Sequence, residues 1–160
     1  ELQYFTGLTS LGDNCFYGCT SLISIIIPNS VTILDNNCFY YCTSLTSITI
    51  PYSVTILDAF CFYFCHSFTS ITISNSVSKL DSRCFMGCEK LTSISCLAAS
   101  APTATSATFG EEYGYTGSAS TNTKYLYVPS NATGYEGTTR DGWAVLLDST
   151  KCNFKISKTL

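Results

Sequence analysis

The sequence predicts an α/β solenoid, a coiled chain in which parallel strands line one side and short helices line the other. A Cys-Phe-x-x-Cys motif occurs four times at intervals of 23 residues. Segments 31–53 and 54–76 are identical at 16 of 23 positions, and the apolar positions recur in register through all four copies. Self-similarity at a fixed period of this length is typical of stacked repeats, in which each repeat buries its apolar side against its neighbours.

The composition agrees with a folded domain and excludes several classes of partner. The 160 residues are enough for one domain, with 46% apolar and 12% charged residues. A net charge of −3 argues against nucleic-acid binding, which needs clustered Lys and Arg. The sequence has no apolar run long enough to insert into a membrane. Glu1 is not followed by the regions of a signal peptide, so we expect the segment to be part of a longer chain.

Each repeat is expected to contain two extended pieces and one short helix. Side chains alternate in residues 47–50, which predicts a half-buried strand with Ile48 and Ile50 inward. Pro51 ends this strand because proline cannot donate to a ladder. Residues 54–57 form a second, shorter extended piece. A single-turn helix should follow it, with aspartates at the expected N-cap positions Asp35, Asp58 and Asp81.

The repeat also resembles a known family. Ile-Pro-Asn-Ser-Val-Thr at residues 27–32, continued by Cys-Phe-x-x-Cys-x-Ser-Leu-x-Ser-Ile at 38–48, resembles the BspA-like leucine-rich repeats of surface proteins from anaerobic bacteria and some protozoa. The resemblance implies a right-handed leucine-rich-repeat solenoid of about six turns, with concave parallel strands and convex helices. It also implies a secreted adhesion or host-interaction module. One departure is that cysteine replaces the family's alanine before each Phe, at Cys15, Cys38, Cys61 and Cys84.

We expect a single leucine-rich-repeat domain over residues 1–160. Residues 8–99 hold four regular repeats, and residues 100–160 hold two degenerate turns and a C-terminal cap. Terminal turns must differ from the others, because an open solenoid end would expose core and an unpaired strand edge.

Four features of the tail support this division. Phe109 is expected to continue the column of Phe residues. Residues 125–129 repeat the pattern of a strand that ends in proline, residues 132–147 should include a helix, and residues 154–156 should form the last strand.

Eight of the ten cysteines follow the repeat, and three interpretations of them are open. The thiols could be inert core packing, they could form disulfides, or they could bind a metal. Burial beside Phe would raise the thiol pKa and reduce reactivity, which favours packing. We therefore predict no metal site and no cofactor.

The outward positions of the strands carry small hydroxyl side chains. Ser47, Thr49, Ser70 and Thr72 should form two ladders on the concave face, and we predict that they contact a ligand. The ladders are also compatible with two roles that involve no such ligand. A tightly stacked sheet tolerates small neutral side chains, and ice-binding solenoids carry hydroxyl ladders, although they need greater flatness and length.

The same two ladders end in larger side chains. Tyr125 and Tyr127 take the outward positions of the expected strand at residues 125–129, and Lys155 takes an outward position on the last strand. Aromatic side chains with a polar tip are frequent in binding surfaces, so we predict that these three residues also contact the ligand. The alternative for the tyrosines is that they cover the cap from outside.

No residues for catalysis are recognisable in the sequence. His66 is the single histidine, and it occupies a column typical of exposed turn residues. No nucleophile elbow, metal-binding His pair or phosphate loop occurs. We expect a non-enzymatic module, extracellular or at the cell surface, that binds a protein or matrix ligand, glycans included, through the concave face. The alternative is a structural spacer of a larger surface protein, with no ligand of its own.

Overall fold

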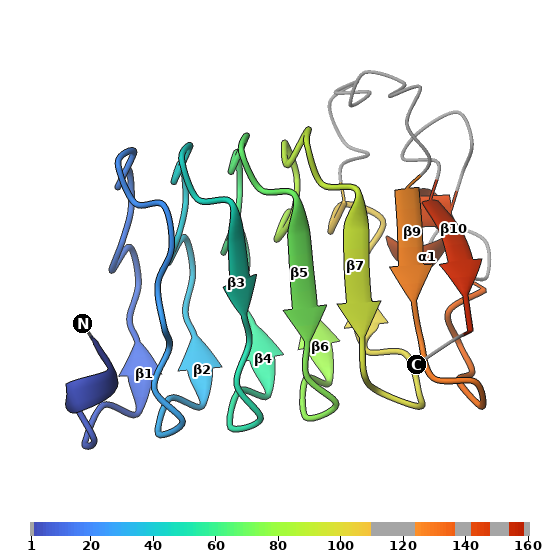
Figure 1. Ribbon diagram of the computed structural model, residues 1–160, viewed down its shortest axis with the longest axis horizontal. Coiled ribbons are helices and arrows are strands. Elements are labelled where there is room, and N and C mark those ends of the chain that lie inside the picture. The colour runs from blue at the N-terminus through green and yellow to red at the C-terminus, as the bar shows by residue number, and fades with distance from the viewer. Residues whose placement is uncertain (1, 110–123, 137–141, 148–153, 159–160) are drawn as a thin grey trace.

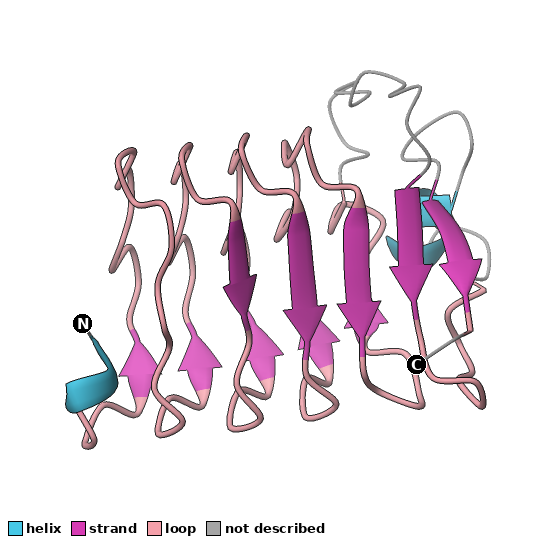
Figure 2. Ribbon diagram, viewed as in Figure 1, coloured by secondary structure: helices cyan, strands magenta, loops and turns pink. Residues whose placement is uncertain are grey.

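The chain forms a solenoid with two parallel sheets, seen in a computed structural model that describes residues 2–109, 124–136, 142–147 and 154–158 (Figure 1). The short-strand sheet consists of β1 (Ser10–Leu11), β2 (Ile33–Leu34), β4 (Ile56–Leu57), β6 (Lys79–Leu80) and β8 (Thr103–Ala104). The long-strand sheet consists of β3 (Ser47–Thr49), β5 (Ser70–Ile73), β7 (Ser93–Cys96), β9 (Lys124–Tyr127) and β10 (Phe154–Ser157). Figure 2 shows the long-strand sheet in front and the short-strand sheet behind it, with the small helical elements η1 (Leu2–Tyr4) and α1 (Gly142–Leu147) at opposite ends.

Neighbouring strands pair in register along each sheet. In the long-strand sheet Ser47 is opposite Ser70 and Ser70 is opposite Ser93, with a step of 23 residues each time. The step lengthens toward the C-terminus, where Tyr125 is opposite Ser93. Lys155 is in turn opposite Tyr125. The tail residues therefore extend the same sheet and the same outward rows.

A column of aromatic rings runs through the interior. Consecutive rings are stacked with centroids 5.2–5.6 Å apart, in the order Phe16, Phe39, Phe62, Phe85 and Phe109. Trp143 from α1 lies 5.5 Å beyond the last ring at a tilt of 52°. The predicted place of Phe109 in this column is confirmed. Each buried Phe contributes about 1.5–3 kcal/mol relative to an exposed one, so the column is a main source of stability.

The predicted helices of the regular repeats are absent, and this expectation is wrong. Asn37 and Tyr41 have φ angles of 56° and 61°, which a helix cannot contain. Alternate backbone N–H groups donate to the next repeat instead, as from Phe39 to the Cys61 oxygen at 2.8 Å. The N–H groups between them donate to the carbonyl three residues earlier, as from Tyr40 to Asn37 at 3.0 Å, and so close four-residue turns. These segments are therefore corner turns that join the two sheets.

The aspartates before these corner turns do not cap helices. Asp81 accepts a hydrogen bond from the backbone N–H of Ser82 at 2.6 Å, and its second carboxylate oxygen lies 2.7 Å from Nζ of Lys79. The Lys79 hydrogen bond, aided by the Ser82 N–H, lowers the pKa of Asp81 below its ordinary value. The side chain thus stabilises the start of a turn.

Other expectations for secondary structure have mixed outcomes. The second extended pieces exist as the short-strand sheet, and β9, α1 and β10 confirm the strands and the helix predicted in the tail. Residues 24–27 do not form a strand, although their equivalents in the later repeats do. The first repeat lies at the edge of the sheet, where a strand has a neighbouring repeat on one side only.

Candidate binding face

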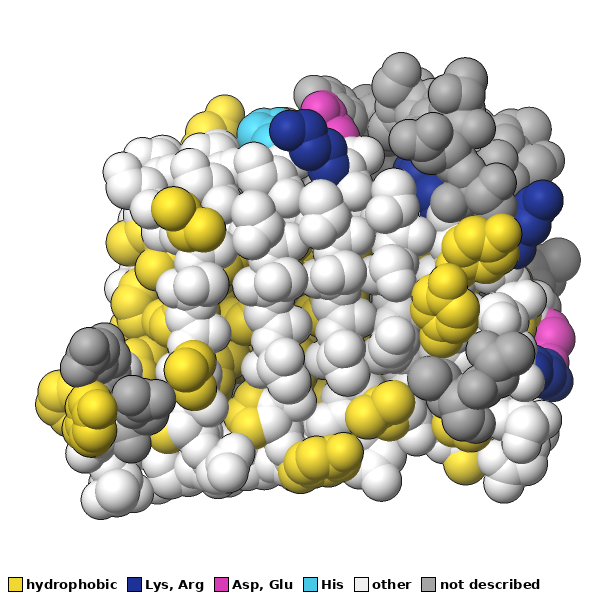
Figure 3. Space-filling view, in the orientation of Figure 1, with side chains coloured by type: hydrophobic (Ala, Val, Ile, Leu, Met, Phe, Trp, Pro, Cys, Tyr) yellow, Lys and Arg dark blue, Asp and Glu magenta, His cyan; other side chains and the backbone are white. Residues whose placement is uncertain are grey.

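Two rows of side chains cross the outer side of the long-strand sheet, which we call the strand face. The upper row consists of Ser47, Ser70, Ser93, Tyr125 and Lys155. The lower row consists of Thr49, Thr72, Ser95, Tyr127 and Ser157. All seven predicted ligand-contacting residues therefore lie in two adjacent rows. Figure 3 shows this face as a grid of small uncharged side chains, with larger hydrophobic side chains at the β9 end.

Strand alternation sets the direction of these side chains. Ile48, Ile71 and Ile94 are buried beneath the upper and lower rows, and Leu126 is buried between the two tyrosines. A strand points successive side chains to opposite faces, so residues on either side of each buried Ile or Leu must face outward. The pattern of burial along β3, exposed–buried–exposed, agrees with this direction.

The hydroxyl groups of this sheet fall into two classes. The threonines that precede the strands donate to a carbonyl oxygen of the previous repeat, as Thr69 Oγ1 does to Thr46 at 3.2 Å. Thr46 and Thr92 make the equivalent bonds. The hydroxyls of the two rows are different. Those of Ser70 and Thr72 make no hydrogen bond with another described residue. The same is true of Ser47, Thr49, Ser93 and Ser95.

These inter-repeat bonds were not foreseen from the sequence. A repeating Thr before a strand is equally compatible with an exposed side chain and with one that bonds to the previous repeat. Only the position of the neighbouring carbonyl distinguishes the two, and that depends on the coil of the chain. The distinction matters here because it separates hydroxyls already used within the fold from hydroxyls that a ligand could bind.

The largest side chains of the strand face form a corner at its C-terminal end. Tyr125 is 39% exposed and Tyr127 is half-buried, and their ring centroids are 5.8 Å apart at 33°. Lys155 lies beside Tyr125 in the register of β9 and β10, and it is exposed. Lys155 forms no ion pair with another described residue. Lys124, in contrast, is buried with Nζ 5.6 Å from the ring centroid of Phe154.

Comparison with known proteins decides the family. The family model described as "BspA type Leucine rich repeat region (6 copies)" matches residues 6–113. The chain belongs to this BspA-type leucine-rich-repeat family. One similar solved structure is the crystal structure of the T. pallidum leucine-rich-repeat protein TpLRR, with 25% sequence identity and a TM-score of 0.54. The match covers 57% of this chain and 47% of that protein, so the chain spans about half of its length. No curated protein sequence matches the chain.

The cysteines of this BspA-type chain are mostly part of its core. Cys38, Cys42, Cys61, Cys65, Cys84 and Cys96 are buried, and the nine described cysteines are free. The second thiol of a motif donates to a carbonyl of the previous repeat, as Cys65 does to Phe39 at 3.2 Å. Burial raises the pKa of Cys42 from 9.0 to about 11. The Cys42 thiol is therefore protonated at neutral pH and poorly nucleophilic. Cys152 lies outside the described residues.

Two cysteines depart from the expected burial. Cys15 and Cys19 are exposed, although the sequence predicted all eight repeat cysteines in apolar surroundings. They belong to the first repeat, where one side of the column has no described neighbour. The carbonyl that would accept a hydrogen bond from Cys19 in an inner repeat has no equivalent here.

A row of aromatic side chains also covers the corner turns. Tyr17, Tyr40 and Tyr63 stack with centroids 4.7 and 4.8 Å apart. Burial, followed by the neighbouring phenols of Tyr63 and Tyr17, raises the pKa of Tyr40. Tyr41 and Phe64 stack beside them at 5.8 Å. The faces of these rings contact one another, so this aromatic group packs the corner turns together.

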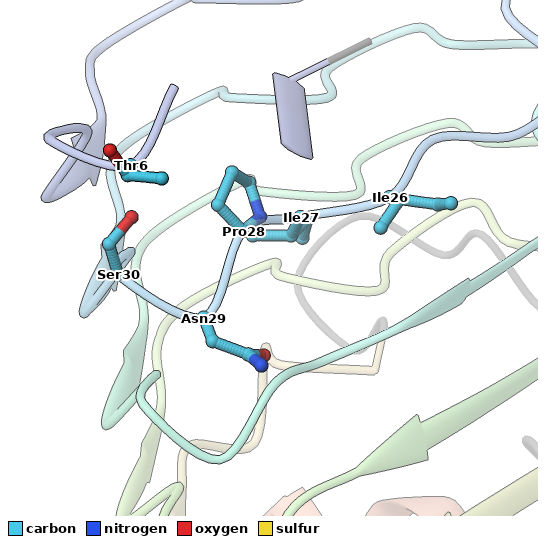
Figure 4. A pocket seen from close by; sticks show the side chains of 6 residues that line it. All are labelled: Thr6, Ile26, Ile27, Pro28, Asn29 and Ser30. Atoms are coloured by element: carbon cyan, nitrogen blue, oxygen red, sulfur yellow. The ribbon is translucent and has the colours of Figure 1, made fainter. Parts of the chain in front are cut away.

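One hollow lies at the N-terminal end of the solenoid. It has a volume of about 340 Å³ and is lined by Thr6 and residues 26–30. Figure 4 shows Thr6 beside Ser30 at one end and Ile26 at the other. Ile26 is exposed, and no titratable side chain lines the hollow. Its lining offers apolar contact and no catalytic group.

Features of an enzyme, a metal centre or a membrane span are not found in the described part of the chain. His66 is partly exposed, with Nδ1 3.8 Å from Oε2 of Glu89, and it contacts the edges of Tyr41 and Phe64. Within the described ranges no group of three His, Cys, Asp or Glu side chains could hold a metal ion. No helix among those residues is long and apolar enough to cross a membrane.

Proposed function

We propose that this BspA-type chain is a non-enzymatic recognition and adhesion module that works outside the cell or at its surface. It binds a protein or matrix ligand through the strand face. The predicted contact residues are Ser47, Thr49, Ser70, Thr72, Tyr125, Tyr127 and Lys155. We take the strand face to be the concave side of a right-handed coil of 23-residue repeats.

One observation supports this proposal above the others. Beside the two outward tyrosines lie six hydroxyls that make no hydrogen bond with a described residue, those of Ser47, Thr49, Ser70, Thr72, Ser93 and Ser95. The neighbouring threonines of the same repeats use their hydroxyls on backbone carbonyls. Hydroxyls without a partner in the fold can exchange bound water for a ligand without breaking a hydrogen bond within the protein, which lowers the cost of binding.

The family gives the general class of function. BspA-type leucine-rich repeats are protein-interaction modules in general and are commonly surface-associated. Adhesion, and location outside the cell, are proposals for this chain. The similar T. pallidum protein is described by its repeat alone, so it suggests no ligand.

The proposed domain organisation agrees with this role. We propose a single domain over residues 1–160, with four regular repeats in 8–99 and two degenerate turns and a cap in 100–160. Two contacts support it, because β9 and β10 extend the long-strand sheet and Trp143 follows Phe109 at the end of the aromatic column. The cap would then carry the residues that discriminate between ligands.

A double variant tests the proposal. We expect Tyr125→Ala/Tyr127→Ala to keep a cooperative melt and to lose capture of a ligand from a panel of purified matrix proteins and matrix glycans. Truncation of an aromatic residue that is a binding hot spot costs about 2 kcal/mol or more. The matched control is Tyr17→Ala/Tyr41→Ala, which removes two exposed tyrosines from the corner turns. Capture by the first variant that equals the wild type would refute the site, and a panel with no binder at all would favour the spacer.

A further inference from the structure

We propose that the corner formed by Tyr125, Tyr127 and Lys155 is a subsite for a glycan that carries a carboxylate, such as a uronate or a sialate. The inference rests on the proposed function, because it names the ligand class of the same strand face. It is carried by three features of the described residues: which backbone groups are already paired, which side-chain groups are free, and where the charge lies.

The paired backbone excludes one common way of binding a peptide. β5, β7 and β9 each have a hydrogen-bonded neighbour on both sides. An extended peptide gains affinity by adding to a free sheet edge, where backbone N–H and C=O groups are unpaired. The strand face over β5, β7 and β9 has no such edge, whereas β10, which carries Lys155, is the end strand of the described sheet. A ligand above this part of the sheet must therefore be recognised by side chains.

The hydroxyl and aromatic side chains in and beside the corner match the chemistry of a sugar. Ser93 and Ser95 stand next to Tyr125 and Tyr127 in the register, and neither hydroxyl bonds to a described residue. A serine hydroxyl can donate one hydrogen bond and accept two, as a sugar hydroxyl also can. A pyranose ring in addition has an apolar face of C–H groups, which suits an exposed aromatic ring. Tyr125 supplies such a ring beside the hydroxyl rows.

The charge of the corner selects an anionic group. Lys155 is the one ionisable side chain at physiological pH in the two rows, and it forms no ion pair with a described residue. No acidic side chain shares these rows, so a carboxylate placed beside Tyr125 would meet a cation without a competing anion. Lys124 adds no accessible charge to the face, because its side chain is buried over Phe154.

Matched oligosaccharides give a direct test on the intact chain. The probes are tetragalacturonate and its fully methyl-esterified form, together with sialyllactose and its methyl ester. The members of each pair differ in the carboxylate charge. We expect both acidic probes to bind more tightly than their neutral partners. An exposed ion pair contributes up to about 1 kcal/mol, so the difference for one carboxylate should be about fivefold. The uronate and sialate pairs then show which acidic sugar is preferred.

Three variants in the corner and one control variant connect the binding to the corner. Lys155→Met should reduce binding of the acidic probe to the level of the neutral probe, whereas Lys90→Met, at another exposed lysine, should change nothing. Tyr125→Ala should abolish binding of both probes. Tyr127→Phe removes only a phenol oxygen from the half-buried ring, so it reports on hydrogen bonding while the ring stays packed.

The results separate this inference from the proposed function. Equal binding of acidic and neutral probes, acidic binding that survives Lys155→Met, or no binding of any probe would each overturn the glycan subsite. If a matrix protein is then captured and Tyr125→Ala/Tyr127→Ala abolishes that capture, the proposed function stands and its ligand is a protein. If the double variant retains every interaction, the proposed function fails as well.

Discussion

At the scale of single residues, the corner turns depend on backbone conformations that most residues avoid. Each corner contains two residues with φ between 55° and 79°; the first set is Asn14, Asn37, Phe60 and Arg83, and the second is Gly18, Tyr41, Phe64 and Gly87. A non-glycine residue in this left-handed region loses about 1–2 kcal/mol, although Asn tolerates it better. The repeat keeps these turns because each one aligns backbone donors with the next repeat.

Gly18 and Gly87 make a matched pair for a stability measurement. A Cβ atom at Gly87 would lie 3.0–3.2 Å from atoms of Phe64, whereas a Cβ atom at Gly18 would meet nothing within 4 Å. Both substitutions to Ala share the penalty of a positive φ, so we expect Gly87→Ala to cost more than Gly18→Ala by about 1–3 kcal/mol, the usual cost of overpacking. Chemical denaturation gives both free energies of unfolding. Equal losses would mean that Phe64 does not pack over Gly87.

At the scale of elements, the aromatic column couples each repeat to the next. Phe62 is fully buried between Phe39 and Phe85, with ring centroids 5.4 and 5.6 Å away. Removing one ring leaves a cavity that borders both neighbours. Because repeats contact only their neighbours, we expect the effect to spread along the solenoid from the altered repeat.

Phe62→Ala should therefore lower the free energy of unfolding by about 3–5 kcal/mol. The control Phe5→Ala alters an exposed ring and should stay within about 0.5 kcal/mol of the wild type. Hydrogen exchange should show weaker protection of the backbone amides of Phe39 and Phe85 as well as of the altered repeat. A melt of Phe62→Ala that resembles the wild type would contradict the assignment of this column to the core.

At the scale of the whole molecule, the sequence predicted the parts that depend on period and alternation. The 23-residue spacing and the alternation around Ile48 and Ile71 were enough to place β3, β5 and β7 and the outward rows, although residues 24–27 form no strand. The prediction of helices at the corner turns was wrong. Residues four apart, such as Cys38 and Cys42, lie on the same side both in a helix and in these corner turns, so their spacing does not distinguish the two. The left-handed conformation of Tyr41 could not be predicted from its residue type, because this conformation is unfavourable for an aromatic residue.

The candidate site was predicted in position but not in chemical detail. The outward direction of Ser70 and Thr72 follows from alternation alone. The difference between their unpartnered hydroxyls and the bonded hydroxyl of Thr69 depends on the distance to the previous repeat, which no local pattern contains. The exposure of Cys15 likewise depends on its place at the end of the column.

A comparison of two obstructing substitutions tests most directly whether ligands bind the strand face. Thr72→Trp places a large ring in the middle of that face, and Thr55→Trp places the same ring next to β4 of the short-strand sheet. We expect Thr72→Trp to weaken capture of the ligand found in the matrix panel by at least about tenfold, which corresponds to 1.4 kcal/mol. We expect Thr55→Trp to bind as the wild type does. Full binding by Thr72→Trp together with loss of binding by Thr55→Trp would contradict the strand face as the binding surface.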